Sequence, residues 1–416
     1  MLRKLLYKQN NVILRNYFSL LLVQITNVIL PLITFPYLVR VLGVKLYGTV
    51  MMAYSLAIFF GIFVDFGFNI TATREVALLR KDKILLSKYF SNVLTIRTIL
   101  LFFSFFLLLI LTHSIQKLSE NIEVYLFSFG IVIGQAIFPS WFFQGIEKMK
   151  TITIINFISK LIFTISIFLF IKNESDYLLA SLFYSLGSII SGFLGIILCL
   201  KFIKAFKPSI KQMKIIFLES FSVFTSNIFV SFYTTLNTLI LGVFTTESLA
   251  GVYVSIEKII VAIKSVYTPL YQAIFPNITV RSKNDVISFI KKILFPIILS
   301  SFLITSIIFV FSEEILSLIF NDLTITEYAY ILKILSIITV FSSLSMMYIT
   351  LLLPSFKQYI KRLKILTFVG FINIIIIIPL IKLFSITGVA FSATFTELIL
   401  FIISLIGLKK FSQDSK

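Results

Sequence analysis

The sequence predicts an all-α polytopic membrane protein in which twelve transmembrane helices form two six-helix bundles related by pseudo-two-fold symmetry, with both termini in the cytosol. Three observations predict this fold class. Twelve apolar stretches fill most of the 416 residues, basic residues collect in alternate gaps between the stretches, and a basic segment divides the stretches into two sets of six.

Each stretch is long enough to cross a bilayer, because a helix of about 20 apolar residues spans the hydrocarbon core. No gap between the stretches is long enough to hold a folded domain, so we expect the function to reside within the membrane or at its faces. The predicted transmembrane helices are 17–41, 47–69, 89–112, 122–145, 151–171, 178–200, 216–243, 248–275, 292–312, 328–353, 365–384 and 387–408.

The distribution of basic residues predicts the orientation. Short cytosolic loops of membrane proteins are enriched in Lys and Arg. Most of the 37 Lys and Arg residues lie in the two tails and in every second gap, which are therefore predicted to be cytosolic. The opposite gaps are more acidic, and their basic residues are Arg40, Lys45, Lys117, Lys172 and Lys382.

The basic segment 201–215 is predicted to link an N-terminal bundle, residues 1–200, to a C-terminal bundle, residues 216–416. An even number of helices in each half gives both halves the same orientation, so a repeat would be parallel, with its axis along the membrane normal. A faint repeat fits this prediction. It pairs Asn27, Leu42, Gly43 and Gly48 with Asn227, Leu241, Gly242 and Gly251.

Composition excludes several classes of function. The net charge of +19 follows from the basic cytosolic segments, so we do not expect a nucleic-acid partner. The single cysteine, Cys199, and the single histidine, His113, leave no disulfide framework and no Cys/His metal cluster. We therefore expect neither a cofactor nor a bound metal.

Charged residues within the apolar stretches are the main candidates for function, because a charge at the bilayer centre is costly unless it faces a bundle interior or water. The basic ones are Arg97, Lys160, Lys258, Lys264 and Lys333, and the acidic ones are Asp65, Glu219, Glu257 and Glu397. Lys160 and Lys258 lie near mid-span, so we predict that they line an aqueous cavity. Three others, Lys333, Asp65 and Glu219, lie near a membrane face, and their side chains can equally reach the interface.

The sign of these charges indicates the substrate. Cations in a low-dielectric cavity bind an anion such as a diphosphate. Amide side chains in the same stretches are candidates for binding sugar hydroxyls, although hydrogen bonding between helices is the alternative for each of them. These residues are Gln24, Asn27, Gln135, Asn156, Asn227, Asn237 and Asn373.

Three strings carry a resemblance to a known family: LPLITFPYLVRVLGVKLYG at 30–48, VDFGFNITATREVALLRKDK at 64–83 and FPSWFFQGIEKMK at 138–150. They resemble the N-terminal half of the Wzx-type oligosaccharide flippases, which serve polysaccharide biosynthesis. This family belongs to the multidrug/oligosaccharidyl-lipid/polysaccharide (MOP) superfamily, together with the lipid II flippases and the MATE drug exporters.

The resemblance implies a MOP-type fold with a cationic central cavity, in the inner membrane of a bacterial cell. It also implies that undecaprenyl-diphosphate-linked oligosaccharides cross from the cytosolic to the outer leaflet by alternating access, for O-antigen or capsule synthesis. On this resemblance Arg74 and Asp65 would lie at the cytosolic mouth.

The site residues predicted by these arguments form three groups. Arg74, Arg97, Lys160, Lys258 and Lys264 would bind the diphosphate; Asp65, Glu257 and Glu397 would act in gating or coupling; Gln24, Asn27, Asn227 and Asn237 would contact sugar. We expect a monomer, with the polysaccharide polymerase and chain-length proteins as candidate partners. The sequence leaves the energy source open among a proton gradient, a sodium gradient and the membrane potential.

Other functions fit parts of the pattern. A membrane-embedded glycan polymerase or ligase also has many spans and acts on lipid-linked sugars, but the short acidic outer gaps argue against such an enzyme. A lipid II flippase would have further spans, and a drug exporter would fit a cationic cavity poorly. A scaffold that transports nothing would leave the intramembrane cations without a purpose.

The predicted topology can be tested with reporter fusions. Fusions after Lys83, Lys211 and Lys361 should report a cytosolic location, because these residues lie in basic segments. Fusions after Glu120, Asp176 and Glu314 should report an external location. An external signal after Lys361 combined with a cytosolic signal after Lys83 would contradict the twelve-helix prediction.

Overall fold

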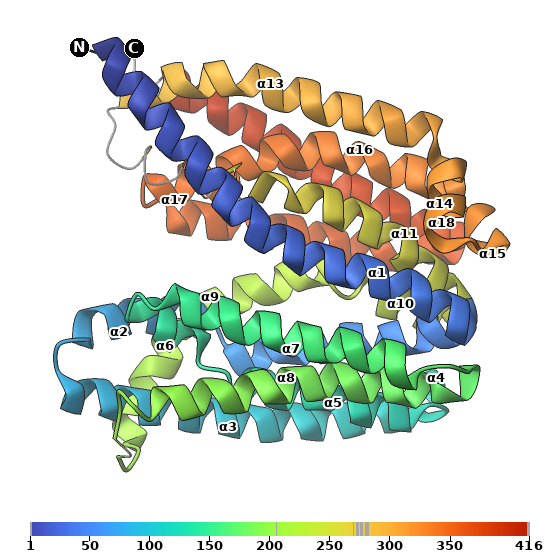
Figure 1. The fold of residues 1–416 in the computed structure, drawn as a ribbon, viewed down its shortest axis with the longest axis horizontal. Helices are drawn as coiled ribbons and strands as arrows, with labels where there is room; N and C mark the ends of the chain where they lie inside the picture. The colour runs from blue at the N-terminus through green and yellow to red at the C-terminus, as the bar shows by residue number, and fades with distance from the viewer. Residues whose placement is uncertain are drawn as a thin grey trace. The chain divides into compact units, whose positions relative to one another are not determined.

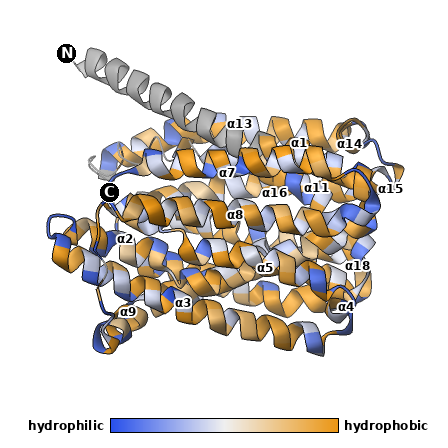
Figure 2. Ribbon diagram, turned by 60° about the horizontal axis from the view of Figure 1, so that its bottom comes forward, coloured by the Kyte–Doolittle hydropathy of each residue, from blue (hydrophilic) through white to orange (hydrophobic). Residues whose placement is uncertain are grey.

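The computed structural model describes residues 2–204, 206–268, 270–271, 274, 278 and 283–413, with side chains from Leu30 onward except at Lys283 and Ser412. Every element in these ranges is helical. Nine of the described helical segments are long and apolar enough to cross a membrane, and Figure 2 shows their apolar residues along almost their whole length. The predicted all-α, multi-span class is therefore confirmed.

Two of these segments each join a pair of the predicted transmembrane helices. In α1 (Leu2–Asp65) the joint is a kink at Gly43, which has φ 70° and ψ 159°. In α18 (Tyr359–Gln413) the joint is a kink at Ser385, which has φ 52°. Each long helical segment therefore has a kink where the sequence predicts a boundary between two spans.

Contacts divide the chain into two compact units. Unit 1 comprises Met1–Arg40 and Val252–Lys416, and unit 2 comprises Val41–Gly251. The predicted bundle boundaries, at residues 200 and 216, do not coincide with these limits. The difference has two causes: the first part of α1 packs with the C-terminal helices, and the helices that follow the basic segment pack with the N-terminal ones.

Unit 2 is built around α5 and α8, which pack along each other, with α3 and α7 against their flanks (Figure 1). The complete helices of unit 2 are α2 (Phe68–Leu79), α3 (Lys83–Ser114), α4 (Gln116–Ser119), α5 (Ile122–Ile137), α6 (Ser140–Gly145), α7 (Met149–Phe170), α8 (Tyr177–Cys199), α9 (Ile210–Thr234) and α10 (Asn237–Phe244). At one end of the unit, Trp141 of α6 is fully buried, with its ring centroid 5.3 Å from that of Phe90.

Unit 1 is built around α16, which packs against both α13 and α18 (Figure 1). Its helices, besides the first part of α1, are α11 (Glu247–Ser265, which begins in unit 2), α13 (Lys283–Val310), α14 (Ser312–Phe320), α15 (Leu323–Thr326), α16 (Ala329–Met346), α17 (Leu353–Ser355) and α18. A π-helical turn, Met347–Leu352, joins α16 to α17.

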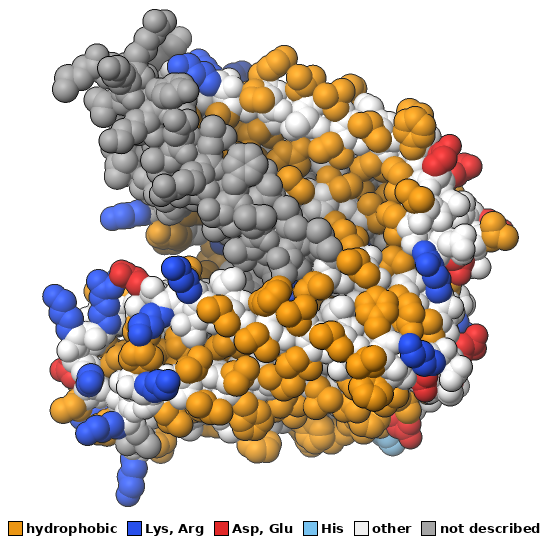
Figure 3. Space-filling model, in the orientation of Figure 1, with side chains coloured by type: hydrophobic (Ala, Val, Ile, Leu, Met, Phe, Trp, Pro, Cys, Tyr) orange, Lys and Arg blue, Asp and Glu red, His pale blue; other side chains and the backbone are white. Residues whose placement is uncertain are grey.

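Large apolar side chains cover the outward faces of the long helices. Phe102 and Phe106 are one turn apart on α3 and are 70% and 62% exposed, and Phe295 and Phe302 are similarly exposed on α13. The space-filling view shows such side chains spread along the helices, while charged side chains gather near helix ends (Figure 3). Exposed apolar area of this extent fits contact with lipid rather than with water.

The basic segment after α8 is bound to α3 through its backbone. The amide nitrogens of Lys204 and Ser209 donate to Ser87 Oγ at 3.0 Å and Asn92 Oδ1 at 2.7 Å. These hydrogen bonds satisfy backbone donors in a stretch that has no helical partner for them. The segment is thus held against α3 within unit 2.

Two of the basic residues in the gaps predicted to be external cap the ends of helices. The Arg40 guanidinium donates to the carbonyl oxygens of Ile319 and Phe320, each at 3.0 Å, where α14 ends. The Lys117 ammonium donates to the carbonyls of Gly242, at 3.1 Å, and Thr245, where α10 ends. The last carbonyls of a helix lack intrahelical donors, and a cation there also interacts favourably with the helix dipole.

Gly48 and Gly251, which the sequence pairs as repeat equivalents, lie against each other within unit 2. A Cβ atom at Gly48 would overlap the Glu247 carbonyl and lie 2.8 Å from the backbone nitrogen of Gly251. A Cβ atom at Gly251 would overlap the Val44 carbonyl and lie 3.2 Å from Gly48 Cα. Two helix backbones therefore approach each other directly, as small residues allow between membrane helices.

This close approach predicts that side chains at either glycine destabilise the fold. Gly48→Ala and Gly251→Ala should each lower the free energy of unfolding by about 1–3 kcal/mol, because the new methyl group overpacks a backbone contact. Gly187→Ala is the matched control, since its Cβ would lie 3.3 Å or more from its neighbours. Thermal unfolding in detergent measures the effect, and equal midpoints for all three variants would contradict it.

Candidate functional site

A polar cavity within unit 2 is the candidate site. Its volume is about 400 Å³, a size within the range of small-molecule sites, roughly 300–1,000 Å³. Its walls come from the end of α1, the start of α2, the end of α5 and the second half of α9. The lining residues are Ile58, Gly61, Ile62, Asp65, Asn69, Gln135, Asn227, Val230, Ser231, Thr234 and Thr235.

A sharp turn between α1 and α2 places Asp65 in this cavity. Phe66 and Gly67 have φ angles of 46° and 81°, and such left-handed geometry suits glycine but costs other residues about 1–2 kcal/mol. The Phe66 ring lies 4.2 Å from the rings of both Phe217 and Phe224 on α9. This stacking holds the strained turn against α9, and the Asp65 carboxylate therefore faces the polar part of that helix.

The Asp65 carboxylate is not fully satisfied by the protein. Its Oδ1 atom is buried and has no hydrogen-bond partner. Burying an oxygen of a carboxylate without a donor is costly. An atom of this kind at a cavity wall is available to a guest molecule that carries a donor.

The hydroxyl groups of α9 offer mainly acceptor sites to the cavity. Ser231 Oγ donates to the Ile228 carbonyl at 2.6 Å, and Thr234 Oγ1 donates to the Val230 carbonyl at 2.9 Å. Each hydroxyl has one proton, so both have only lone pairs left for another molecule.

The Gln135 amide also lines the cavity. The Gln135 side chain lies directly over Gly61, where any Cβ atom would overlap its amide oxygen. The absence of a side chain at Gly61 therefore makes room for the Gln135 amide beside the cavity. Gln135 and Asn227 can each both donate and accept hydrogen bonds.

Arg97, a predicted diphosphate ligand, is bound to the backbone at a helix break. Pro139 has no N–H group, so the Gln135 carbonyl at the end of α5 lacks its usual donor. The guanidinium of Arg97 donates to the carbonyls of Gln135, at 2.5 Å, and Phe138, at 3.0 Å. Arg97 is 3% exposed and interacts electrostatically with Asp65.

Within unit 1, the structure brings together two of the predicted charged residues. Lys264 Nζ on α11 lies 2.5 Å from Glu397 Oε1 on α18, with side chains that are 27% and 12% exposed. Glu257 Oε1 accepts a hydrogen bond from Tyr253 at 3.3 Å. The Lys258 ammonium lies 5.4 Å from the centre of the Phe35 ring.

The pairing changes the charge balance that the sequence suggests. Lys264 is not an unpaired cation, because Glu397 neutralises it across two helices. Its predicted role in binding a diphosphate and the coupling role of Glu397 are thus tied to one ion pair. Lys258 and Glu257, adjacent on α11, add one further charge of each sign.

The remaining predicted residues lie apart from these groups. Arg74 is exposed on α2, and Lys160 is half-buried on α7. Asn237 is 2% exposed and donates to the Tyr233 carbonyl at 3.1 Å, so its amide takes part in the local helix structure. The side chains of Gln24 and Asn27 lie outside the described residues.

Sequence reasoning missed the α9 hydroxyls and Gly61 as parts of the cavity. A signal for the hydroxyls was present, because Asn227, Ser231 and Thr234 recur at helical spacing and so share one face of α9. No comparable signal marked Gly61, whose role follows from a neighbour on a different helix.

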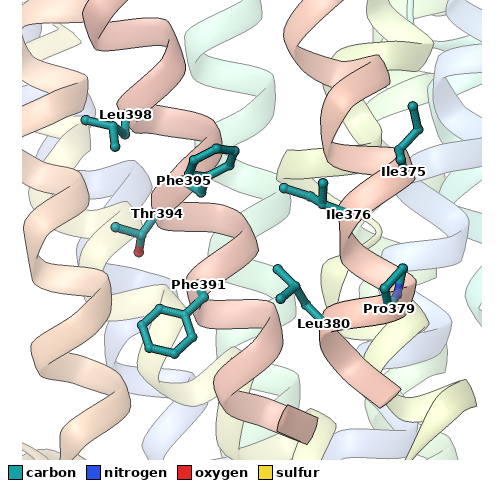
Figure 4. A pocket seen from close by; sticks show the side chains of 8 residues that line it. All are labelled: Ile375, Ile376, Pro379, Leu380, Phe391, Thr394, Phe395 and Leu398. Carbon is teal, nitrogen blue, oxygen red and sulfur yellow. The ribbon is translucent and has the colours of Figure 1, made fainter. Parts of the chain in front are cut away.

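A second cavity, of about 650 Å³, lies in unit 1 between the two halves of α18 (Figure 4). Its walls are apolar except for the Thr394 hydroxyl, which donates to the Ile334 carbonyl at 3.3 Å. The side chains that line it are Ile375, Ile376, Pro379, Leu380, Phe391, Thr394, Phe395 and Leu398. Such walls fit hydrocarbon and offer little to a sugar or a phosphate.

The long apolar helices and the polar cavity of unit 2 define a polytopic membrane protein with a polar site among its helices. Residues 13–281 match the family described as polysaccharide biosynthesis protein, and the chain belongs to this family. A proposed O-antigen transporter of Escherichia coli strain K12 is 30% identical over 268 residues, which are 64% of this chain and 64% of that protein. The match therefore spans slightly less than two thirds of that relative.

Solved structures share the fold over almost the whole chain. An inward-facing multidrug resistance transporter of the MATE family, in the MOP superfamily, has a TM-score of 0.72 and 12% identity, covering 93% of this chain and 96% of its own. The lipid II flippase MurJ in an inward closed conformation has a TM-score of 0.63 and 18% identity, with coverage of 94% and 87%. The predicted MOP-type fold is confirmed.

Because Arg97 donates to carbonyls at the end of α5, we expect it to stabilise the fold. Arg97→Met should lower the free energy of unfolding by about 2–4 kcal/mol, because the carbonyls of Gln135 and Phe138 lose a charged donor. Arg74→Met, which removes the same charge from an exposed site, should change it by about 0.5 kcal/mol or less. Thermal unfolding in detergent compares the two variants, and equal losses would contradict the capping role.

Proposed function

We propose that this protein is a transporter that moves undecaprenyl-diphosphate-linked oligosaccharide repeat units from the cytosolic to the outer leaflet of the bacterial inner membrane. It would act by alternating access through a cationic central cavity and supply O-antigen, capsule or a related surface polysaccharide. The observation that carries the proposal is the polar cavity of unit 2, in a chain of the polysaccharide biosynthesis family whose fold matches a lipid II flippase.

The chemistry of the cavity supports a saccharide as cargo. Amides, hydroxyls and a carboxylate converge on a space of about 400 Å³ within an otherwise apolar helical unit. Isolated polar groups of this kind are costly in a membrane unless they bind one another, water or a substrate. Vicinal hydroxyls of a sugar can both donate to and accept from planar amides.

The wider architecture in this proposal has twelve transmembrane helices in two six-helix bundles, with both termini in the cytosol. Contact between Gly48 and Gly251 supports a pseudo-two-fold relation, since equivalent residues meet only near a two-fold axis. The caps made by Arg40 and Lys117 support the same relation. Arg40 joins the gap after the first predicted helix to the gap after the ninth. Lys117 joins the gap after the third to the gap after the seventh, which are the equivalent gaps in the other half of the repeat.

The diphosphate requires positive charge once its water is removed. We assign this role to Lys160 and Lys258, with Arg74 as a contact at the cytosolic mouth. The ion pair of Lys264 with Glu397 is the candidate for coupling, because a proton or a cation that competes for the carboxylate would release the ammonium. Asp65 and Glu257 are further candidates for this step.

Complementation tests the proposed function. Expression of this chain in a strain that lacks its oligosaccharide flippase should restore surface polymer and remove the lipid-linked repeat units that accumulate on the cytosolic leaflet. The strain with an empty vector is the control. Normal membrane expression without any fall in the accumulated lipid, tested against several repeat-unit structures, would contradict the proposal.

Substitutions at Lys258 separate charge from shape in the same assay. Lys258→Arg should keep substantial flipping, while Lys258→Ala should lose about 10- to 100-fold, since a hydrogen bond to a charged group contributes about 1.5–3 kcal/mol. Lys258→Glu should lose more, because the carboxylate repels the diphosphate. Lys333→Ala is the matched control, since Lys333 is also in unit 1 and lies 5.8 Å from a ring, that of Phe309. Flipping by Lys258→Glu at the parental rate would exclude Lys258.

A further inference from the structure

The polar cavity of unit 2 has an unusual charge balance for a protein of net charge +19. Among its described lining residues, Asp65 is the one ionisable side chain, so the wall carries negative charge and no cation. The group on the cargo that enters this cavity must therefore differ from the diphosphate, which needs positive partners.

We propose that this cavity receives a sugar ring of the cargo and selects uncharged sugars over acidic ones, with Asp65 as the residue that determines this specificity. The proposal rests on the function proposed above and adds the class of sugar to it. Three features of the cavity carry it: the free Asp65 oxygen, the acceptor character of the α9 hydroxyls and the position of Arg97.

The first two features determine which hydrogen-bonding groups a bound molecule must carry. Asp65 Oδ1 is buried without a donor, and the protons of Ser231 and Thr234 are already donated to backbone carbonyls. Three oxygens of residues that line the cavity thus present lone pairs. A sugar hydroxyl brings a proton to such an oxygen and can accept in turn from Gln135 or Asn227.

An acidic sugar would bind poorly beside Asp65 and these acceptor oxygens. A uronate carboxylate has no proton to give and would set its charge beside that of Asp65 in a region of low dielectric. Like charges that share a buried site force one group to take up a proton or to leave. An uncharged ring with a primary alcohol in place of the carboxylate avoids both costs.

Arg97 does not supply the missing positive partner. Its charge acts on Asp65, but the residue is 3% exposed and its two terminal nitrogens donate to the carbonyls of Gln135 and Phe138. Turning it toward a guest would strip those carbonyls. Arg97 therefore stabilises the helix break and leaves the cavity wall acidic.

The test measures occupancy of the cavity directly. In a Cys199→Ala background, a Thr235→Cys substitution places a thiol in the cavity wall, and a water-soluble maleimide labels it in vesicles. The probes are undecaprenyl diphosphate carrying glucose and undecaprenyl diphosphate carrying glucuronic acid, which differ only at C6. Glucosyl lipid at about twice its Kd should slow labelling about threefold, and glucuronyl lipid should leave the rate unchanged.

Two variants separate the carboxylate from general surface charge. Asp65→Asn keeps the shape and should allow the glucuronyl lipid to protect the thiol as well. Glu219→Gln removes an exposed carboxylate from α9, the helix of Ser231 and Thr234, but outside the cavity, and should leave the discrimination as it was. Equal protection by both lipids with Asp65 in place, absence of protection by the glucosyl lipid, or loss of discrimination in Glu219→Gln would each overturn the proposal.

Transport is read separately, as movement of each lipid across the vesicle membrane. Selective protection of the thiol without movement of either lipid would sustain the assignment of the cavity and overturn the proposed function. Movement of both lipids at equal rates together with equal protection would sustain the function and overturn the selectivity. The two failures are therefore distinguishable.

Discussion

The requirement that backbone polar groups find partners away from water governs much of this structure. Each break or end of a helix leaves carbonyl oxygens without intrahelical donors. Basic side chains supply the donors at three such places: Arg97 where Pro139 interrupts the chain between α5 and α6, Lys117 at the end of α10, and Arg40 at the end of α14. Some basic residues of this protein therefore serve to donate hydrogen bonds to the carbonyl oxygens at helix ends.

This use of charge limits which residues remain for a substrate. An arginine within an apolar stretch could equally bind a diphosphate or cap a helix, and the two uses place different demands on its exposure. Arg97 is enclosed and engaged with carbonyls, while Lys264 is paired with Glu397 across two helices. In the proposed function, the diphosphate is assigned to Lys160 and Lys258 because of their positions near mid-span.

In the proposed function, the polar cavity of unit 2 gives the sugar a place that is chemically distinct from that of the diphosphate. It depends on backbone geometry more than on composition: a strained turn directs Asp65 inward, stacking on α9 holds that turn, and Gly61 leaves room for Gln135. The apolar cavity of α18 in unit 1 offers a third kind of environment, suited to hydrocarbon. A lipid-linked saccharide combines all three chemistries in one molecule.

The sequence by itself determined the all-helical, multi-span class, the places where α1 and α18 bend, the family and the glycine pair 48 and 251, because hydrophobic length, charge bias and local motifs are properties of neighbouring residues. It also gave Asp65 and Asn227 as candidates for the site. Only the tertiary structure decided that Arg97 caps α5, that Lys264 pairs with Glu397 and that Gly61 and Ser231 shape one cavity. Those outcomes depend on which helix faces meet, and residues from 38 to 170 positions apart in the chain must come together before their chemistry is defined.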